Sequence, residues 1–285
     1  MPMRRLRIFR VALATIFFMA AALLALFPLW SRGNNAMLNA VAQAQIQPSA
    51  LFLRSSLSVT AGVTLFWLAL SFLFGRVYCS TLCPIGTLCD ISAWAGRKVG
   101  HKERSYRFTE PKNVRFSLLW IYLGTLVLGQ LAFPFLVEPW NIWRNIFSTV
   151  NPGTVKDTWV ALGVPAAVGM TAGVISLIFI VLFSLRTGRG FCTAICPIGT
   201  ALGVVSSFSP TQIAIDPDRC ISCMKCEEVC PSGCVKVVSR YVDNSRCVRC
   251  LDCLDVCPAK AIGFTSNRNR PASPLFMKQR KNIPS

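Results

Sequence analysis

GRVYCSTLCPIGT, from Gly75 to Thr87, organises the chain, because GRGFCTAICPIGT repeats it 113 residues later, from Gly188 to Thr200. Each copy carries a Cys-x3-Cys-Pro phrase directly after a long apolar run, and two apolar runs separate the copies. If each run crosses a membrane, two crossings return the chain to the same side, so the repeat is parallel. We therefore expect four cysteines together at one membrane edge. They are Cys79, Cys83, Cys192 and Cys196.

The composition is typical of a membrane protein. Hydrophobic residues make up 53% of the 285 residues, and the mean hydropathy is +0.50, which is too apolar for an ordinary soluble domain. A bilayer-spanning helix needs about 20 apolar residues. The runs that can serve are 6–29, 57–74, 117–137 and 160–185. We therefore expect four transmembrane helices.

The basic residues predict an orientation. Lys and Arg gather before the first run, in the loop 75–116 and after Leu185, whereas the loops 31–53 and 138–160 hold few. The positive-inside bias then places both termini and the loop 75–116 on the cytoplasmic side of the membrane, which we expect to be a bacterial inner membrane. It also accounts for the formal net charge of +18 without nucleic acid. The basic start and the AVA at 40–42 resemble a signal peptide, but the apolar run is long for one, so we expect an uncleaved anchor.

The C-terminal third carries a very specific motif. DRCISCMKCEEVCPSGCVKV (Asp218–Val237) and SRCVRCLDCLDVCPAKAIGF (Ser245–Phe264) both read C-x2-C-x2-C-x3-C-P. In two-cluster bacterial ferredoxins with this pattern, the fourth cysteine of each run ligates the other cluster. One [4Fe–4S] cluster is then expected on Cys220, Cys223, Cys226 and Cys257. The other is expected on Cys247, Cys250, Cys253 and Cys230. A structural zinc module is the weaker alternative.

Other local features complete the pattern. Each proline after the fourth cysteine is expected to turn the chain into a short helix, in SGCVKV and in AKAI. Of the fourteen cysteines, Cys89 aligns with Leu202 and Cys234 with Ala261, so both are expected to be small buried apolar residues.

The CxxxCP cysteines leave two interpretations open. They could converge on an iron–sulfur centre or zinc, or they could be free dithiols or a redox-active disulfide.

Several chemistries lack the residues they need. His101 is the only histidine and no CxxCH occurs, so bis-histidine and attached c-type haem are excluded. No GxGxxG opens a βαβ unit, which leaves nicotinamide or flavin binding unsupported. With a single histidine we expect no hydrolytic or group-transfer chemistry. Electrons must come from a lipid-soluble donor or a partner protein.

The expected outer loop could meet a lipid-soluble donor. In VEPWNIWRNIFSTVNPG (Val137–Gly153), Trp140, Trp143 and Phe147 fall on one face of a short helix at the membrane surface. The ordinary explanation is the aromatic belt of membrane proteins. The functional explanation is that this aromatic face covers a quinol head group, with Glu138 accepting the protons of the quinol. Quinol there would lie most of a bilayer from a cytoplasmic ferredoxin, so the CxxxCP thiols would serve as an intermediate redox centre.

The chain resembles the polytopic ferredoxin-type proteins of the NapH, MauN and NosR kind. The resemblance rests on GRVYCSTLCP, GRGFCTAICP, CISCMKCEEVCP, CVRCLDCLDVCP and the EPW phrase. We expect no large N-terminal domain of the NosR-like kind, so the NapH/MauN layout is expected to fit better. The resemblance implies an electron-transfer subunit of the cytoplasmic membrane. NapH-like members are thought to oxidise quinol for a periplasmic system, and MauN-like members serve cofactor maturation.

We therefore expect three regions. Residues 1–205 form four transmembrane helices in two parallel-repeat pairs, 206–265 form a small α+β two-cluster ferredoxin domain, and 266–285 form a loose basic tail. The expected function is a relay from quinol through two [4Fe–4S] clusters to a periplasmic or cytoplasmic redox partner. The alternatives are a maturation factor that supplies electrons to a client enzyme and a redox sensor. The sequence does not name the client, the donor or the direction of flow.

Overall fold

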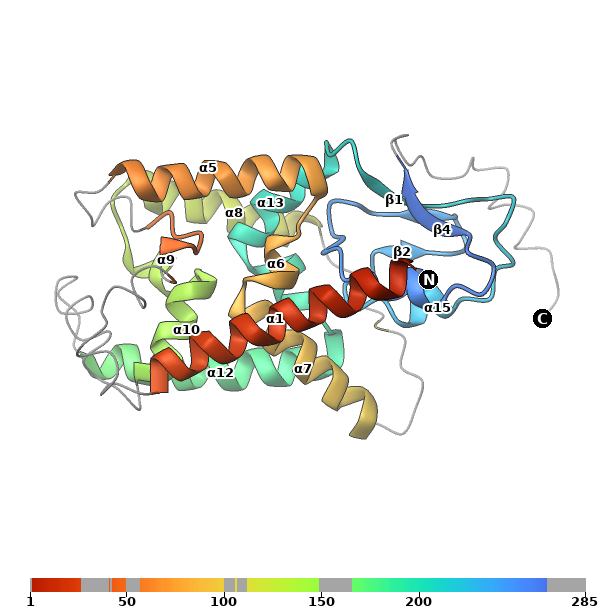
Figure 1. Cartoon of the computed structure of the whole chain (residues 1–285). Helices are drawn as coiled ribbons and strands as arrows, with labels where there is room; N and C mark the ends of the chain where they lie inside the picture. Colours follow the sequence, from red (N-terminus) through yellow and green to blue (C-terminus); the bar gives the residue numbers. More distant parts are fainter. Residues whose placement is uncertain are drawn as a thin grey trace.

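The computed structural model describes residues 2–26, 41, 43–49, 57–99, 106, 112–148 and 166–265. They form an elongated helical body joined to a small domain that carries short strands (Figure 1). The tail 266–285, most of the basic loop 100–111 and the outer segment 149–165 lie outside the described residues. The expectations for those segments therefore stay predictions.

Four helices run along the length of the helical body (Figure 1). They are α1 (Pro2–Leu26), α5 (Leu57–Phe74), α8 (Lys112–Val127) and α12 (Ala166–Thr187). Their outward faces stay apolar, since Phe9, Trp120 and Ile175 are each about two-thirds exposed or more. Among the described residues, one helix is both long and apolar enough to cross a membrane, over Arg4–Leu23 near the N-terminus. The expected set of four spans is thus not confirmed and stays a prediction.

The third expected span, 117–137, is wrong as a continuous helix. α8 ends at Val127, and the short helix α9 (Ala132–Val137) follows after a turn. Gly129 takes φ +70°, and the Gln130 N–H donates to the Thr125 carbonyl at 2.9 Å, which closes the helix as a glycine in the left-handed conformation commonly does. The 16 residues of α8 reach only about 24 Å, less than the roughly 30 Å of a bilayer core.

The two halves of the body follow the same path. After α5 the chain turns at Gly75, forms the one-turn helix α6 (Tyr78–Thr81) and continues as α7 (Pro84–Val99). After α12 it turns at Gly188, forms the short π-helix η2 (Phe191–Ile195) and continues as α13 (Pro197–Ser207). Both glycines have positive φ, which lets the chain fold back into the body.

The halves are interlocked. Helix α7 of the first half packs against α12 of the second, and α13 of the second half packs against α5 of the first. Pro84 and Pro197 each begin their helix, a position that suits proline because its missing N–H would have no helical partner. The cysteine phrases therefore lie inside the body, between the crossing helices, and their expected place at one membrane edge stays a prediction.

The small domain is built around two antiparallel strand pairs. Strand β1 (Gln212–Ile215) pairs with β4 (Ile262–Thr265), with Ile215 opposite Ile262. Strand β2 (Val235–Lys236) pairs with β3 (Tyr241–Val242). Two short helices, α14 (Lys225–Glu228) and α15 (Asp252–Val256), complete it. Its own buried core includes Ile213, Val235 and Val242.

The expected helices in SGCVKV and AKAI are wrong. Val235 lies in β2 and Ile262 in β4, while the helices α14 and α15 precede the prolines. Both residues are β-branched, which favours strands, and both are buried against a partner strand. The strand partner therefore decides the conformation after each proline.

The N-terminal end of α1 lies beside α15 of the small domain (Figure 1). Arg7 Nε donates to Asp252 Oδ1 at 2.7 Å, and the same guanidinium pairs with Asp255. One turn on, Arg10 Nη1 lies 3.6 Å from Asp90 Oδ2. The Arg7 ion pairs fasten the first helix to the small domain, and the Arg10 ion pair fastens it to α7 of the helical body.

Replacing Arg7 with alanine is expected to loosen this junction. Arg7 is partly exposed, so solvent screening limits the two ion pairs to at most about 1 kcal/mol. Amide hydrogen exchange in α15 should then accelerate up to about fivefold. The matched control is Arg4→Ala, an exposed arginine one turn earlier on α1. Equal acceleration in both variants would show that Arg7 does not fasten the domain.

Candidate metal and redox centres

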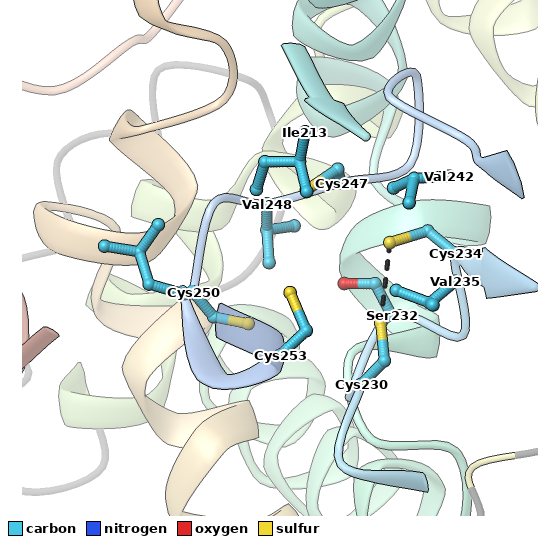
Figure 2. A pocket seen from close by; sticks show the side chains of 11 residues that line it. Ile213, Cys230, Ser232, Cys234, Val235, Val242, Cys247, Val248, Cys250 and Cys253 are labelled. Atoms are coloured by element: carbon cyan, nitrogen blue, oxygen red, sulfur yellow. Dashed lines mark hydrogen bonds between the residues drawn. The ribbon is translucent and has the colours of Figure 1, made fainter. Parts of the chain in front are cut away.

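A cavity in the small domain brings the two cysteine runs together (Figure 2). Four of the cysteines that line it come from both runs: Cys247, Cys250, Cys253 and Cys230. Three belong to the second run and one to the first, which is the crossed arrangement that the motif predicts. We call these four the proximal set, because Cys250 also belongs to the core of the helical body.

Cys234 lines the same cavity, opposite Cys250 and Cys253 (Figure 2). It is buried, and its Sγ lies 3.4 Å from Cys230 Sγ. A hydrogen bond with Cys234 lowers the pKa of Cys247 to about 6, toward the thiolate form that binds iron. Cys234 therefore lies beside the proximal set and outside the four expected ligands.

The four other ferredoxin cysteines form the distal set. They are Cys220, Cys223, Cys226 and Cys257. Cys226 is buried, and the thiols that act on it electrostatically include Cys257 from the second run. Cys223 is exposed, so this set reaches the protein surface. The two sets therefore differ in access, with the proximal set against the body and the distal set open to solvent.

Both cysteine loops share an unusual backbone. Ser222 and Arg249 have φ +57°, and the next-but-one residues, Met224 and Leu251, have φ +64° and +67°. Non-glycine residues avoid this left-handed region, so its use at matched positions of both runs indicates a functional constraint. The alternation curls each loop around its three thiols.

The four CxxxCP cysteines also lie together. Each is buried, and all belong to a single apolar core with Cys250. The thiols act on one another electrostatically across the two halves. Among the described residues no three His, Cys, Asp or Glu side chains are close enough to share one metal ion. The thiol ligands of a single metal ion must all lie about 2.3 Å from that ion. The thiol ligands of a cluster bind different iron atoms and can lie farther apart, so the spacing of these four thiols suits a cluster better than a single ion.

Two arginines cross-link the cysteine phrases. Arg76 Nη2 donates to the Cys192 carbonyl, and Arg189 Nη1 donates to the Cys79 carbonyl, both at 2.7 Å. Both arginines are fully buried. Sequence reasoning missed them, although the GR dipeptide that opens each phrase was visible. The pseudo-twofold symmetry of the repeat thus extends to its hydrogen bonds.

Cys89 has a closer neighbour than expected. It is fully buried, as its alignment with Leu202 predicts, and Leu202 is buried too. Its Sγ, however, lies 3.9 Å from Cys192 Sγ. A fifth thiol therefore adjoins the CxxxCP cysteines.

Glu138 lies at the end of the body opposite the small domain, between α9 and α10 (Pro139–Ser148) (Figure 1). Its carboxylate is fully buried and accepts hydrogen bonds from Tyr122 Oη at 2.7 Å and Asn141 Nδ2 at 2.8 Å. Ser49 adds its backbone N–H at 3.0 Å and its hydroxyl at 2.6 Å. Four donors therefore surround one carboxylate, and only Asn141 is its sequence neighbour.

The tryptophans of α10 point into the core. Trp140 and Trp143 are each 3% exposed, so the aromatic-belt interpretation does not fit them. Trp143 contacts Phe18 and Phe147, with ring centroids 5.1 and 4.7 Å away. The indole N–H groups of both tryptophans are buried and have no hydrogen-bond partner among the described residues.

The segment 43–49 links Glu138 to the cysteine phrases. Ser49 bonds Glu138, and three residues earlier the Ile46 N–H donates to the Tyr78 hydroxyl at 3.3 Å. Tyr78 in turn donates to Gln45 Oε1 at 2.7 Å. The segment 43–49 therefore contacts both Glu138 and Tyr78, the residue that precedes Cys79.

Glutamine at position 138 is expected to flatten the pH dependence of thermal stability. Burial raises the pKa of Glu138 from 4.5 to about 7, so the folded state binds its proton more tightly than the unfolded state. The resulting stability is complete below about pH 4.5 and is lost as the pH rises through 7. Tryptophan-fluorescence melting in detergent between pH 5 and 8 tests this. Glu228→Gln, at an exposed position, is the control, and identical slopes in wild type and Glu138→Gln would contradict the prediction.

Family models for iron–sulfur proteins match three segments of the chain. A 4Fe-4S binding domain matches residues 59–102, a 4Fe-4S dicluster domain matches 187–234, and another 4Fe-4S binding domain matches 240–263. The ferredoxin-type protein NapH of Haemophilus influenzae is 32% identical over 60% of this chain and 52% of its own length. The methylamine utilization ferredoxin-type protein MauN of Paracoccus denitrificans is 30% identical over 55% and 48%.

The chain is a polyferredoxin, because three of its segments match 4Fe-4S domains, and it is similar to the ferredoxin-type proteins NapH and MauN. It spans about half the length of the curated relatives it matches. No solved structure matches it. The polyferredoxin is an iron–sulfur electron-transfer protein, and both of its CxxxCP phrases lie within matched 4Fe-4S segments.

Proposed function

We propose that this polyferredoxin is a quinol dehydrogenase-type subunit of the bacterial inner membrane that passes electrons through two [4Fe–4S] clusters to a redox partner. One observation carries the proposal. A single buried apolar core includes Trp143 at the outer end, the four CxxxCP cysteines in the middle, and Cys250 of the proximal set. Such a core offers a continuous buried path between the ends of the molecule.

The surface of the body supports a membrane location. Large apolar side chains of all four long helices face outward, among them Phe9, Leu65, Trp120 and Ile175. Monomeric soluble proteins rarely expose so extended an apolar surface. We propose that residues 1–205 span the membrane several times, with both termini and the ferredoxin domain, 206–265, in the cytoplasm, as the basic residues predict.

The donor sets suit the clusters that the family models describe. Eight cysteines fall into two crossed sets of four, and the proximal set surrounds a cavity. We propose that the proximal and distal sets each hold one [4Fe–4S] cluster. When bound, each cluster takes up and releases one electron at a time. The distal set, with exposed Cys223, is placed to meet the partner.

The outer end of the body offers groups that suit a quinol head group. Oxidation of quinol releases two electrons and two protons. The unpartnered indole N–H groups of Trp140 and Trp143 can donate to quinol oxygens. Glu138, whose pKa is raised to about 7 by burial, can exchange a proton near neutral pH, once one of its four donors releases it.

The test is reduction by quinol. The protein is purified anaerobically in detergent, its iron and sulfide are counted, and its EPR spectrum is followed during titration with a reduced menaquinol analogue. We expect quinol to reduce the ferredoxin clusters. Clusters that dithionite reduces but quinol does not would overturn the quinol dehydrogenase role.

A second candidate is a maturation factor that supplies electrons for cofactor or metal-site assembly in a client. It is favoured by the exposed surface at the distal set, where Cys223 lies between exposed Ile221 and Met224, because a cytoplasmic donor could deliver electrons there. Reduction by a cytoplasmic ferredoxin or flavoprotein, and not by quinol, would support this function.

A further inference from the structure

Two fully buried guanidinium groups lie beside the CxxxCP cysteines, and only one has a carboxylate partner. Arg189 pairs with Asp90 through Nε at 2.6 Å and Nη2 at 2.5 Å. Arg76 donates to the Cys192 carbonyl at 2.7 Å and to the Ser245 carbonyl at 3.3 Å. Within the described part of the chain no carboxylate contacts Arg76, and its buried Nε has no hydrogen-bond partner.

A buried positive charge without a counter-charge is strongly unfavourable. Arginine cannot avoid this by losing its proton, and carbonyl groups solvate the charge without neutralising it. A negative group must therefore lie in the same buried region. The ionisable groups around Arg76 are thiols, since its charge acts electrostatically on Cys79, Cys192 and Cys196.

The chemical state of these thiols decides whether Arg76 is balanced. Free thiols and disulfides are both neutral, so neither of those interpretations supplies the charge. Four thiolates around an iron–sulfur cluster carry about −2 in total. One of these negative charges would balance Arg76, and the other would lie beside the Arg189–Asp90 pair.

Backbone groups also point toward these sulfurs. The Gly199 N–H donates to Cys196 Sγ at 3.3 Å, and the Gly86 N–H makes the matching contact with Cys83. Both donors lie in the first turn of a helix, α13 or α7. Helix N-termini favour negative charge, so each half of the repeat aims one helix N-terminus and one arginine at the thiols.

We propose that Cys79, Cys83, Cys192 and Cys196 together bind a third iron–sulfur cluster, with Arg76 as its counter-charge. This deepens the proposed function and rests on it for the direction of flow. The cluster takes one electron from the donor at the outer end and releases one to the proximal set through the shared core. No bond to the polypeptide forms or breaks in that transfer.

The first test counts iron and sulfide in anaerobically reconstituted protein. We expect the wild type to hold two or four irons beyond the eight of the ferredoxin domain. The Cys79→Ser/Cys192→Ser double variant should hold eight and keep the EPR signals of the ferredoxin clusters, which shows that it is folded. The matched control is Cys89→Ala, since Cys89 is equally buried beside Cys192 but outside the motif, and it should keep the wild-type iron. Eight irons in the wild type would overturn the proposal.

The second test addresses the charge. Arg76→Gln should lose the additional irons or lower the potential at which they are reduced, whereas Arg76→Lys should keep them close to wild type. Equal behaviour of the two variants would refute the counter-charge role. If the additional cluster is present and dithionite reduces it but quinol does not, the quinol donor is wrong and the third cluster stands. If quinol reduces a protein that holds only eight irons, the quinol donor stands and the third cluster is wrong.

Discussion

Replacing Cys250 with serine is expected to remove about four irons per chain and to abolish reduction of the distal cluster by quinol. Cys250 belongs to the proximal cavity and also to the core of the helical body. If the proposed relay is correct, every electron from the outer end passes this position. Iron analysis and EPR at equal protein concentration measure the first effect, and stopped-flow bleaching of cluster absorbance measures the second.

Cys234→Ala is the matched control for that variant. Cys234 is buried and lines the same cavity, and the second ferredoxin run carries alanine at the corresponding position, Ala261. It should therefore keep its iron and its reduction by quinol. A Cys250→Ser protein in which quinol still reduces the distal cluster at the wild-type rate would show that electrons enter by another route.

Alanine at Gly86 or at Gly199 is expected to destabilise the helical body severely. A Cβ at Gly86 would lie 2.2 Å from the Cys79 carbonyl oxygen, and a Cβ at Gly199 would lie 2.2 Å from the Cys192 carbonyl oxygen. Backbone atoms cannot rotate away, so the cysteine phrase itself must move. Overpacking of this kind costs about 3 kcal/mol or more, which lowers Tm by roughly 10 °C in a protein of this size.

Gly62→Ala and Gly124→Ala are the controls for steric overlap. Both glycines lie within helices, and a Cβ at either meets nothing within 4 Å. Alanine is the better helix former by about 1 kcal/mol, so these variants should melt at or above the wild-type temperature. Equal losses in all four variants would show that the close carbonyl contact is not responsible.

Local sequence patterns predicted the structural features that depend on residues close together in the chain. The apolar run 57–74 became α5 with the expected bounds, because the run is uninterrupted and Gly75 ends it. The aromatic spacing at Trp140 and Trp143 predicted a short helix, and α10 is that helix, although both tryptophans are buried in the body. The two-cluster ferredoxin motif predicted that thiols of both runs meet, and Cys230 of the first run lines one cavity with Cys247, Cys250 and Cys253 of the second; the assignment of ligands to clusters stays a prediction.

Distant partners explain what the sequence analysis missed. Arg76 was counted among the basic residues of a cytoplasmic loop, yet it is buried against a carbonyl 116 residues away. The donors to Glu138 were not foreseen, because Ser49 and Tyr122 reach it from positions 89 and 16 residues away. Gly129 lies within an apolar run, and periodicity alone does not show that its φ ends the helix there.

The interlocked halves have a consequence for how the protein is made. The Arg76 side chain needs the Cys192 carbonyl, and the Cys79 carbonyl needs Arg189, across sequence separations of 116 and 110 residues. During synthesis the first cysteine phrase therefore lacks these hydrogen bonds until the second phrase has left the ribosome. Any group that requires all four thiols can be inserted only after both halves have been made and have packed together. A nascent chain arrested between the two phrases should present reactive cysteines that the finished protein hides.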